Sequence, residues 1–247
     1  MQRKKSPELL LVSRRAGKAI MDYGMIEEGD RIAVAVSGGK DSISLLHVLR
    51  HRRKISPVRF DFTAVHIDFG FPDFSPQVLA EYLEKEGFPF LIEKATGLEG
   101  EQWQEINCFW WSWNRRKALF HLAAEKGFNK LAFGHHMDDI AETILLNQFY
   151  RGEIGAMKPK QELFDGKLTI IRPLAYEREA MMVRLAQELG ITTLGQSRCA
   201  DEETSHRALI KNMLKEFEKD NPNIVKNIFK SLQNIRTEYL LETAGSD

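Results

Sequence analysis

The sequence predicts an α/β protein built on an open parallel sheet of about five strands, with helices on both faces and a helical appendage at the C-terminus. Short β-rich runs alternate with helical patterns along most of the chain. No internal repeat or low-complexity segment interrupts this alternation. The 247 residues suit one large α/β domain, or such a domain with a small appendage.

Five β-rich runs are the expected strands. The first, RIAVAV at residues 31–36, is almost wholly apolar, as expected for a strand that is covered on both faces. The others span residues 60–69, 90–95, 130–133 and 168–171. Pro173 follows the last of these runs, and it cannot donate a hydrogen bond to a continuing strand.

Helical patterns lie between and after these strands. The expected helices span residues 41–53, 76–87, 112–126, 137–150 and 177–189. Gly190 is placed to cap the last of them. From residue 201 onward the chain reads as solvated helices, the second opened by Pro222. We therefore expect an N-terminal helical segment over 1–28, a main domain over 29–200 and a C-terminal helical appendage over 201–247, packed on the same domain.

Charge and hydropathy narrow the classes of function. Lys and Arg number 35 and so do Asp and Glu, so no global field draws the chain to nucleic acid. RNA binding would need a local patch made by basic runs such as residues 3–5, 14–18, 51–54 and 158–160, which read by default as solvated surface. No run approaches the ~18 apolar residues of a membrane span. The N-terminal apolar stretch is too short for a signal peptide, so we expect a cytoplasmic protein.

A glycine turn follows the first strand and opens a helix, with the sequence SGGKDS at residues 37–42. Two glycines let the backbone approach a ligand closely. The helix start directs free N–H groups and a positive dipole end at that ligand. Hydroxyl and ammonium groups add donors, so the expected ligand is a phosphate chain. A serine-capped turn without a ligand is the weaker alternative.

Asp41 is the informative residue of this turn. A carboxylate among phosphates is repulsive unless a cation such as Mg²⁺ lies between them. Asp41 is therefore a candidate metal ligand.

A second polar cluster, GHHMDD at residues 134–139, follows the fourth strand. This is the carboxyl edge of the sheet, where open α/β folds bind ligands. Asp138 and Asp139 would repel a bound phosphate unless they hold Mg²⁺ or orient an acceptor. Helix caps are one alternative, and a zinc site is another, although zinc would require three or four converging ligands.

SGGKDS after an apolar strand resembles the pyrophosphate-binding loop of the PP-loop ATPases, and the chain is most similar to the tRNA 2-thiocytidine synthetase family. Further matching stretches are RAGKAI at residues 15–20 with DY at 22–23 and MIEEGD at 25–30, GHHMDDIAET at 134–143, and IRPL at 171–174. The resemblance covers residues 8–240. It implies an adenine-nucleotide α-hydrolase-like, Rossmann-like fold in which residues 29–200 form the PP-loop ATP-binding domain.

The resemblance also implies roles for individual residues. The implied ATP contacts are Ser37, Gly38, Gly39, Lys40, Asp41, Ser42, His66, Gly134, His135 and Arg172. The implied catalytic residues are Asp41, Asp139, Arg115, Cys108 and Cys199, and the implied Mg²⁺ ligands are Asp41, Asp138 and Asp139. His66 reads equally well as a packed side chain, and a surface ion pair is the alternative for Arg172.

The cysteines depart from the family's pattern. Related enzymes have two Cys-x-x-Cys pairs that support an iron–sulfur cluster, whereas this chain has only Cys108 and Cys199. Two thiolates per chain disfavour a [4Fe-4S] cluster unless two copies of the chain share one site as a homodimer. The two thiols could instead act as a persulfide relay, or be inert. All four tryptophans lie between Trp103 and Trp113, where packing is favoured over stacking on a flipped base.

The expected activity is ATP-dependent adenylation of a tRNA pyrimidine carbonyl, followed by sulfur insertion from a donor protein or sulfide. One alternative keeps the adenylation but uses a small-molecule acceptor, which the neutral charge and missing cysteines favour. Another is an ATP-binding protein with reduced catalysis. Fold-level analogy cannot choose between the acceptors.

Overall fold

The computed structural model describes residues 6–70, 74–95, 108–191 and 205–241, except for the side chains of residues 108–112. The chain divides into two compact units, each treated separately below. The first comprises Met1–Met137 and Lys158–Ser205, and the second comprises Asp138–Met157 and His206–Asp247. In the described part of the chain, no helix is both long and apolar enough to cross a membrane.

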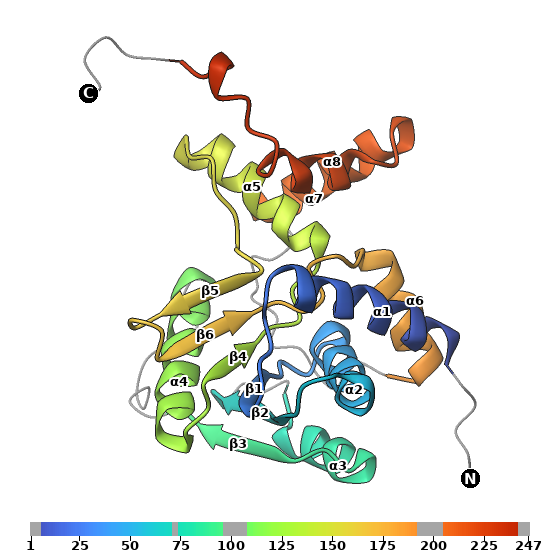
Figure 1. Ribbon diagram of the computed structural model, residues 1–247, viewed down its shortest axis with the longest axis vertical. Coiled ribbons are helices and arrows are strands. Elements are labelled where there is room, and N and C mark those ends of the chain that lie inside the picture. The colour runs from blue at the N-terminus through green and yellow to red at the C-terminus, as the bar shows by residue number, and fades with distance from the viewer. Residues whose placement is uncertain (1–5, 71–73, 96–107, 192–204, 242–247) are drawn as a thin grey trace. The chain divides into compact units, whose positions relative to one another are not determined.

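A six-stranded sheet forms the centre of the first unit, with the strand order β3-β2-β1-β4-β6-β5 (Figure 1). Its strands are β1 (Asp30–Ala35), β2 (Phe60–Asp68), β3 (Phe90–Lys94), β4 (Lys130–Ala132), β5 (Lys160–Leu163) and β6 (Leu168–Ile171). Every neighbouring pair is parallel except β5 with β6. The carboxyl ends of β1, β2, β3, β4 and β6 therefore share one edge of the sheet.

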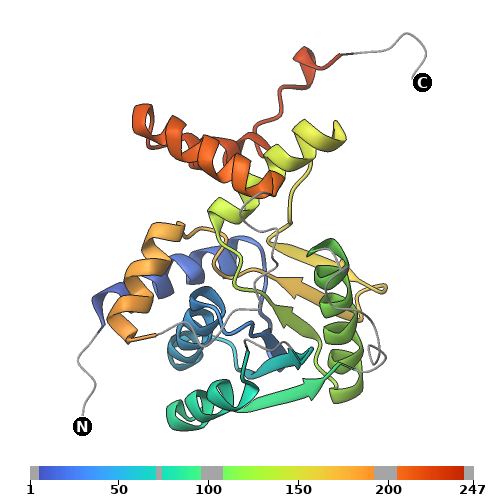
Figure 2. The same ribbon diagram turned by 180° about the vertical axis from the view of Figure 1, so that it is seen from behind.

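Helices cover both faces of the sheet, as Figures 1 and 2 show. The larger core cluster joins one face to α1 (Pro7–Asp22), α2 (Lys40–Ile55), α3 (Pro76–Glu86) and α6 (Glu179–Leu189). A second cluster joins the other face to α4 (Cys108–Lys126). The predicted α/β fold with helices on both faces is thus confirmed.

Local chemistry explains several helix ends. The Ser6 hydroxyl accepts a hydrogen bond from the Leu9 N–H at 3.2 Å, and Pro7 follows it in the first turn of α1. Helices α3 and α6 end at Gly87 and Gly190, whose φ angles of 70° and 64° are left-handed. The predicted cap at Gly190 is therefore confirmed.

The second unit is helical. It contains the body of α5 (Met137–Arg151), α7 (His206–Asp220), α8 (Ile224–Ser231) and a short 3₁₀ turn at Thr237–Tyr239. The rings of Tyr150 on α5 and His206 on α7 stack with centroids 3.9 Å apart. Ile210, Leu214, Val225 and Phe229 are the buried apolar residues of α7 and α8.

Apart from shifts of one or two residues at other helix and strand ends, four details differ from the sequence predictions. Strand β5 was not predicted, because KQEL has no apolar run. Helix α4 begins four residues before the expected Ser112. Helix α6 begins at Glu179 and not at Glu177, because Arg178 has the extended backbone of an N-cap. Pro222 precedes α8, whose N-cap is Asn223, so it does not open that helix as predicted.

Candidate nucleotide-binding site

The glycine turn lies where it was predicted, between β1 and α2 at the carboxyl edge of the sheet. The Val36 N–H donates to the Val65 carbonyl at 2.8 Å, so the chain stays in the sheet up to the turn. Gly38 has a φ of 81°, which a side chain would strain. Gly39 is the N-cap of α2 and provides no side-chain cap. The first N–H groups of α2 are therefore available to an anion.

Two serines hold this turn in shape. The Ser37 N–H donates to the Ser42 hydroxyl at 3.2 Å, and the Ser42 hydroxyl donates to the Gly39 carbonyl at 2.9 Å. The Gly39 N–H lies 3.4 Å from the Ser37 hydroxyl. These bonds close the turn onto itself, so the loop is organised before any ligand arrives.

Lys40 and Asp41 stand at the start of α2. The Lys40 ammonium lies 2.9 Å from Asp41 Oδ2 and 3.8 Å from Glu179 Oε1. Asp41 Oδ1 is buried and has no hydrogen-bond partner among the described residues. A buried carboxylate oxygen normally has a partner, so this atom fits contact with a cation or a donor from a ligand.

Gly134 brings β4 against this helix start. A Cβ on Gly134 would lie 3.0 Å from the Asp41 carbonyl carbon and 3.0 Å from the Ser42 nitrogen. Both of these atoms are backbone and cannot rotate away. The absence of a side chain at Gly134 therefore lets the turn sit directly against the end of β4.

We expect Gly134→Ala to displace the turn and weaken ATP binding by about tenfold, because overpacking of this kind costs about 1–3 kcal/mol. Calorimetric titration of ATP measures this effect. Gly155→Ala is the matched control, since its Cβ would meet only the Asn147 amide nitrogen at an ordinary 3.7 Å. Equal ATP affinity in the two variants would contradict the steric argument.

Arg172 follows β6 at the same edge and is 5% exposed. Its Nε donates to His135 Nδ1 at 3.3 Å, and its Nη1 donates to the Lys158 carbonyl. Burial, and next the nearby charge of Arg116, lowers the pKa of Arg172 to about 10. No carboxylate among the described residues pairs with it. Among the described residues Arg172 is therefore buried and makes no ion pair, so the alternative of a surface ion pair is wrong for this part of the chain.

His66, at the end of β2, is packed. Its Nδ1 lies 2.8 Å from the Val36 carbonyl and its ring stacks on Phe74 with centroids 4.6 Å apart. Burial lowers the pKa of His66, the backbone bond opposes this shift, and the charge of Arg115 adds to it. Burial also lowers the pKa of Arg115. Arg115 therefore lies near His66 in the first unit.

Asp138 and Asp139 open α5 and belong to the second unit. Asp139 Oδ1 lies 3.7 Å from Nη1 of Arg207 on α7, and Glu142 Oε2 lies 3.5 Å from the same atom. Among the described residues, no three His, Cys, Asp or Glu side chains are grouped as a metal site. The zinc alternative thus gains no support from this part of the chain.

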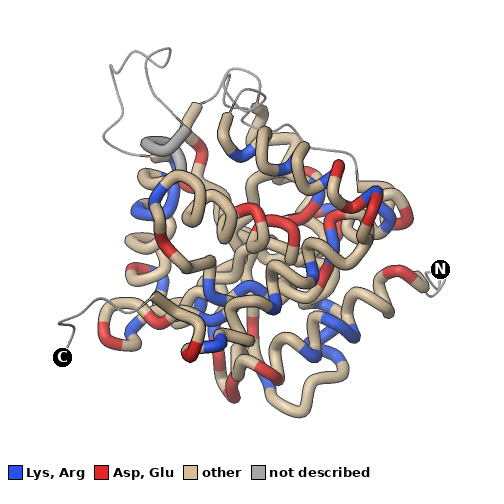
Figure 3. The backbone as a smooth tube through the Cα atoms, turned by 90° about the horizontal axis from the view of Figure 1, so that it is seen from above, with Lys and Arg blue, Asp and Glu red and all other residues tan. Residues whose placement is uncertain are grey.

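Cys108 is the first residue of α4, and its side chain is not described. Cys199 lies outside the described residues, as do Trp103 and the basic run at residues 3–5. Trp113 is 54% exposed, with the Lys117 ammonium 5.5 Å from its ring centroid, so part of this ring is open to solvent. Elsewhere basic and acidic residues are interspersed along the backbone (Figure 3).

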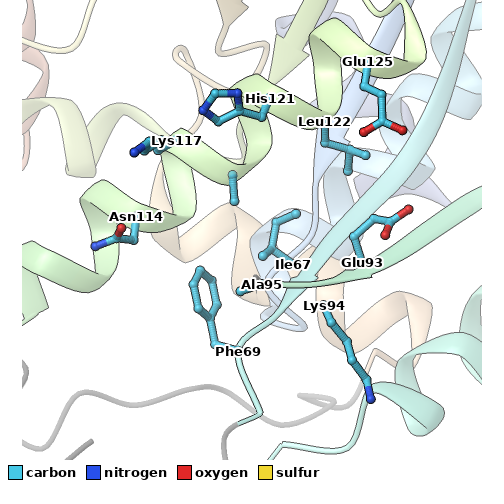
Figure 4. Close-up of a pocket in the computed structure, with 11 residues that line it drawn as sticks. Ile67, Phe69, Glu93, Lys94, Ala95, Asn114, Lys117, His121, Leu122 and Glu125 are labelled. Atoms are coloured by element: carbon cyan, nitrogen blue, oxygen red, sulfur yellow. The ribbon is translucent and has the colours of Figure 1, made fainter. Parts of the chain in front are cut away.

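A groove of about 540 Å³ lies between α4 and the ends of β2 and β3 (Figure 4). Ile67, Phe69 and Ala95 line its strand side, while Asn114, Lys117 and His121 project from α4. The groove was not predicted from the sequence, because its residues come from separate segments with no shared motif.

Three glutamates near the predicted residues also escaped the sequence analysis. Glu179 reaches Lys40, Glu142 reaches Arg207, and Glu177 is fully buried beside Arg15. Glu177 Oε2 lies 3.3 Å from the Arg15 guanidinium, and its main-chain carbonyl accepts from the Met137 N–H at 2.8 Å. The carboxyl-edge rule could have indicated Glu177 and Glu179, since both follow β6 closely.

Comparison with known proteins places this geometry in a family. Residues 10–217 match the PP-loop domain family. The chain is 40% identical to tRNA-cytidine(32) 2-sulfurtransferase of Geotalea daltonii and 41% identical to that of Geotalea uraniireducens, with 94% of each chain covered in both comparisons. Its fold is similar to that of the U34-tRNA thiolase NcsA from Methanococcus maripaludis, a structure with a [4Fe-4S] cluster. The TM-score is 0.75 at 19% identity, covering 96% of this chain and 81% of that one.

The SGGKDS turn packs closely against Gly134, and the chain matches the family over nearly its whole length. These observations indicate the same family. The chain is therefore an ATP-utilising enzyme of the PP-loop family, and within that family it belongs with the tRNA-cytidine(32) 2-sulfurtransferases.

Proposed function

We propose that this enzyme activates a pyrimidine carbonyl of tRNA with ATP and replaces the carbonyl oxygen with sulfur. The observation that carries the proposal is the organised SGGKDS turn, with its open helix start and with Asp41 Oδ1, which has no hydrogen-bond partner among the described residues. The names of the relatives supply the acceptor class, a tRNA cytidine, and the reaction, 2-sulfur transfer.

The first step is adenylation. The turn from Ser37 to Ser42 would hold the pyrophosphate of ATP through its N–H groups and the Lys40 ammonium. The carbonyl oxygen of the base attacks the α-phosphorus, the bond from that phosphorus to the pyrophosphate oxygen breaks, and pyrophosphate leaves. Positioning and charge stabilisation supply most of the rate.

The second step is sulfur transfer. A sulfur nucleophile attacks the adenylated ring carbon, and the bond from that carbon to the AMP oxygen breaks, so that AMP leaves with the former carbonyl oxygen. We assign sulfur delivery to a donor protein or sulfide, with Cys108 and Cys199 as the candidate carriers. A [4Fe-4S] cluster would need ligands beyond these two cysteines, so no step is assigned to one.

Mg²⁺ fits the proposed site. Asp41 Oδ1, which lacks a hydrogen-bond partner in the described part of the chain, is a suitable ligand, since Mg²⁺ is commonly held by one or two carboxylates together with substrate phosphates. Asp138 and Asp139 are the other candidate ligands. Bound there, Mg²⁺ would neutralise charge on the phosphates. His135, Gly134 and His66 are proposed ATP neighbours, and Asp139 and Arg115 are proposed catalytic residues.

The test is AMP release from radiolabelled ATP and Mg²⁺, measured anaerobically with and without bulk tRNA. We expect AMP only when tRNA and a sulfide source are both present, together with a thiolated cytidine detected by nucleoside mass spectrometry. AMP release that ignores tRNA would instead identify a small acceptor. Tight ATP binding without turnover in either tube would identify a protein with reduced catalysis.

A further inference from the structure

Arg172 is a buried cation whose charge the described residues do not neutralise. At 5% exposure it has lost nearly all its water, yet its two hydrogen-bond acceptors, His135 Nδ1 and the Lys158 carbonyl, carry no negative charge. Buried charges in proteins are normally paired, because an isolated one is costly. Two of the guanidinium N–H groups therefore have neutral acceptors, while no negative charge among the described residues balances the positive charge.

A second arginine increases this excess. Arg116 is on α4, and its positive charge adds to burial in lowering the pKa of Arg172. The two guanidinium groups therefore lie near each other. Arg116 itself is exposed, but a like charge near the buried guanidinium of Arg172 is repulsive, so the pair makes physical sense when an anion joins the two groups. Arginine presents a planar fork of donors that matches phosphate oxygens.

The cluster lies on the α4 face of the sheet. His135 stacks on Phe133 with centroids 5.4 Å apart, and Phe133 packs against the core cluster that joins the sheet to α4. The SGGKDS turn opens α2, which packs in the core cluster of the opposite face. The turn also lies against Gly134, whose neighbour His135 bonds Arg172, so two cationic features approach the same part of the carboxyl edge from opposite faces of the sheet.

We propose that Arg172 and Arg116 bind a backbone phosphate of the acceptor RNA next to the nucleotide that reacts. This inference rests on the proposed function and adds a substrate-positioning site to it. In the proposed function the SGGKDS turn binds the pyrophosphate of ATP. A second cationic site on the other face suits the acceptor RNA, which must approach the bound ATP. A phosphodiester carries one negative charge, which pairs with the buried charge of Arg172, while the charge of the exposed Arg116 remains partly solvated.

The experiment compares Arg116→Ala, Arg172→Lys and the wild type in tRNA binding, in ATP binding and in the KM for each substrate during AMP release. Arg116 is exposed, so its truncation should leave the fold intact, and Arg172→Lys keeps the charge but loses the fork. Arg59→Ala is the matched control, because Arg59 is exposed at the amino edge of the sheet, before β2.

We expect Arg116→Ala to weaken tRNA binding about tenfold and to lower the salt-dependence slope by about one, with ATP affinity unchanged. Arg172→Lys should raise the KM for tRNA and not that for ATP, in contrast to the ATP contact that the family resemblance implies for Arg172. Loss of ATP affinity in either variant would assign the anion to ATP and overturn the inference, and so would tRNA binding equal to that of Arg59→Ala. If the wild-type protein neither bound tRNA nor released AMP in response to it, this inference and the proposed function would be overturned together.

Discussion

Replacing Asp41 with alanine is expected to abolish AMP release while leaving the fold intact. The side chain stands in the first turn of α2 beside the proposed pyrophosphate. Its Oδ2 lies 2.9 Å from the Lys40 ammonium, and its Oδ1 has no partner among the residues that the structure describes. Without it, the proposed cation loses its protein ligand at the phosphates, and Lys40 loses a neighbour that fixes its position. Losses of this kind typically lower kcat by a factor of ~100 or more.

The measurement is single-turnover AMP formation at saturating ATP, with thermal unfolding recorded on the same samples. Asp61→Ala is the matched control, because Asp61 is 87% exposed and makes a surface ion pair with Arg53, of a kind worth little. Asp41→Asn should fail like Asp41→Ala, since an amide keeps the size but not the charge. Undiminished AMP formation in Asp41→Ala, with the control also active, would remove Asp41 from the mechanism.

Glu177→Gln is expected to stabilise the protein at alkaline pH. Glu177 is fully buried, and burial raises the pKa of its carboxyl from the ordinary 4.5 to about 7, although Arg15 opposes this shift. The folded state therefore holds its proton more tightly than the unfolded state does. The resulting stability is complete below pH 4.5 and is lost as pH rises through 7, which amounts to about 3 kcal/mol in all.

Glutamine keeps the neutral form at every pH, so its advantage over the wild type should grow from pH 5 to pH 8. Urea unfolding at both pH values gives the two free energies of unfolding. Glu84→Gln, on the exposed side of α3, should change them by no more than ~0.5 kcal/mol. If the free energies of unfolding of Glu177→Gln and the wild type differed by the same amount at pH 5 and pH 8, the raised pKa of Glu177 would be refuted.

The sheet was predictable because its central strands are apolar on both faces. Most residues of RIAVAV and FDFTAVHIDF are apolar and are buried in the structure, and the SGGKDS turn indicates which end of the first strand meets a ligand. Strand β6 was predicted with its correct bounds because Pro173 follows it closely. These signals are local, so one sequence is enough to read them.

Strand β5 lacked such a signal, since its alternate residues are charged or polar. Asp165-Gly166 was an available clue, because this pair favours hairpin loops. In the structure Phe164, Asp165 and Gly166 all have positive φ, and Leu163 pairs with Leu168 across the loop. The hairpin would have followed from reading that pair together with the strand after it.

The individual candidate residues were predictable from motifs, whereas their surroundings were not. Nothing in the spacing of IRPL shows that Arg172 is buried without a carboxylate, or that Arg116 lies near it. The sequence predicts Glu177 as the first residue of a helix, whereas its burial depends on α1, which is more than 150 residues away in sequence. Long-range proximity of this kind is set by the packing of α1 and α6 on one face of the sheet.

Strand β5 also determines how the sheet meets a second protein molecule. A strand at the end of a sheet exposes unpaired backbone groups that can recruit another chain and start aggregation. Strand β5, one of the two edge strands, carries Lys160 and Glu162, whose charged groups lie 3.8 Å apart. Pairing of another strand with β5 would have to bury these charges. The charges on β5 therefore disfavour the addition of a further strand at this edge of the sheet.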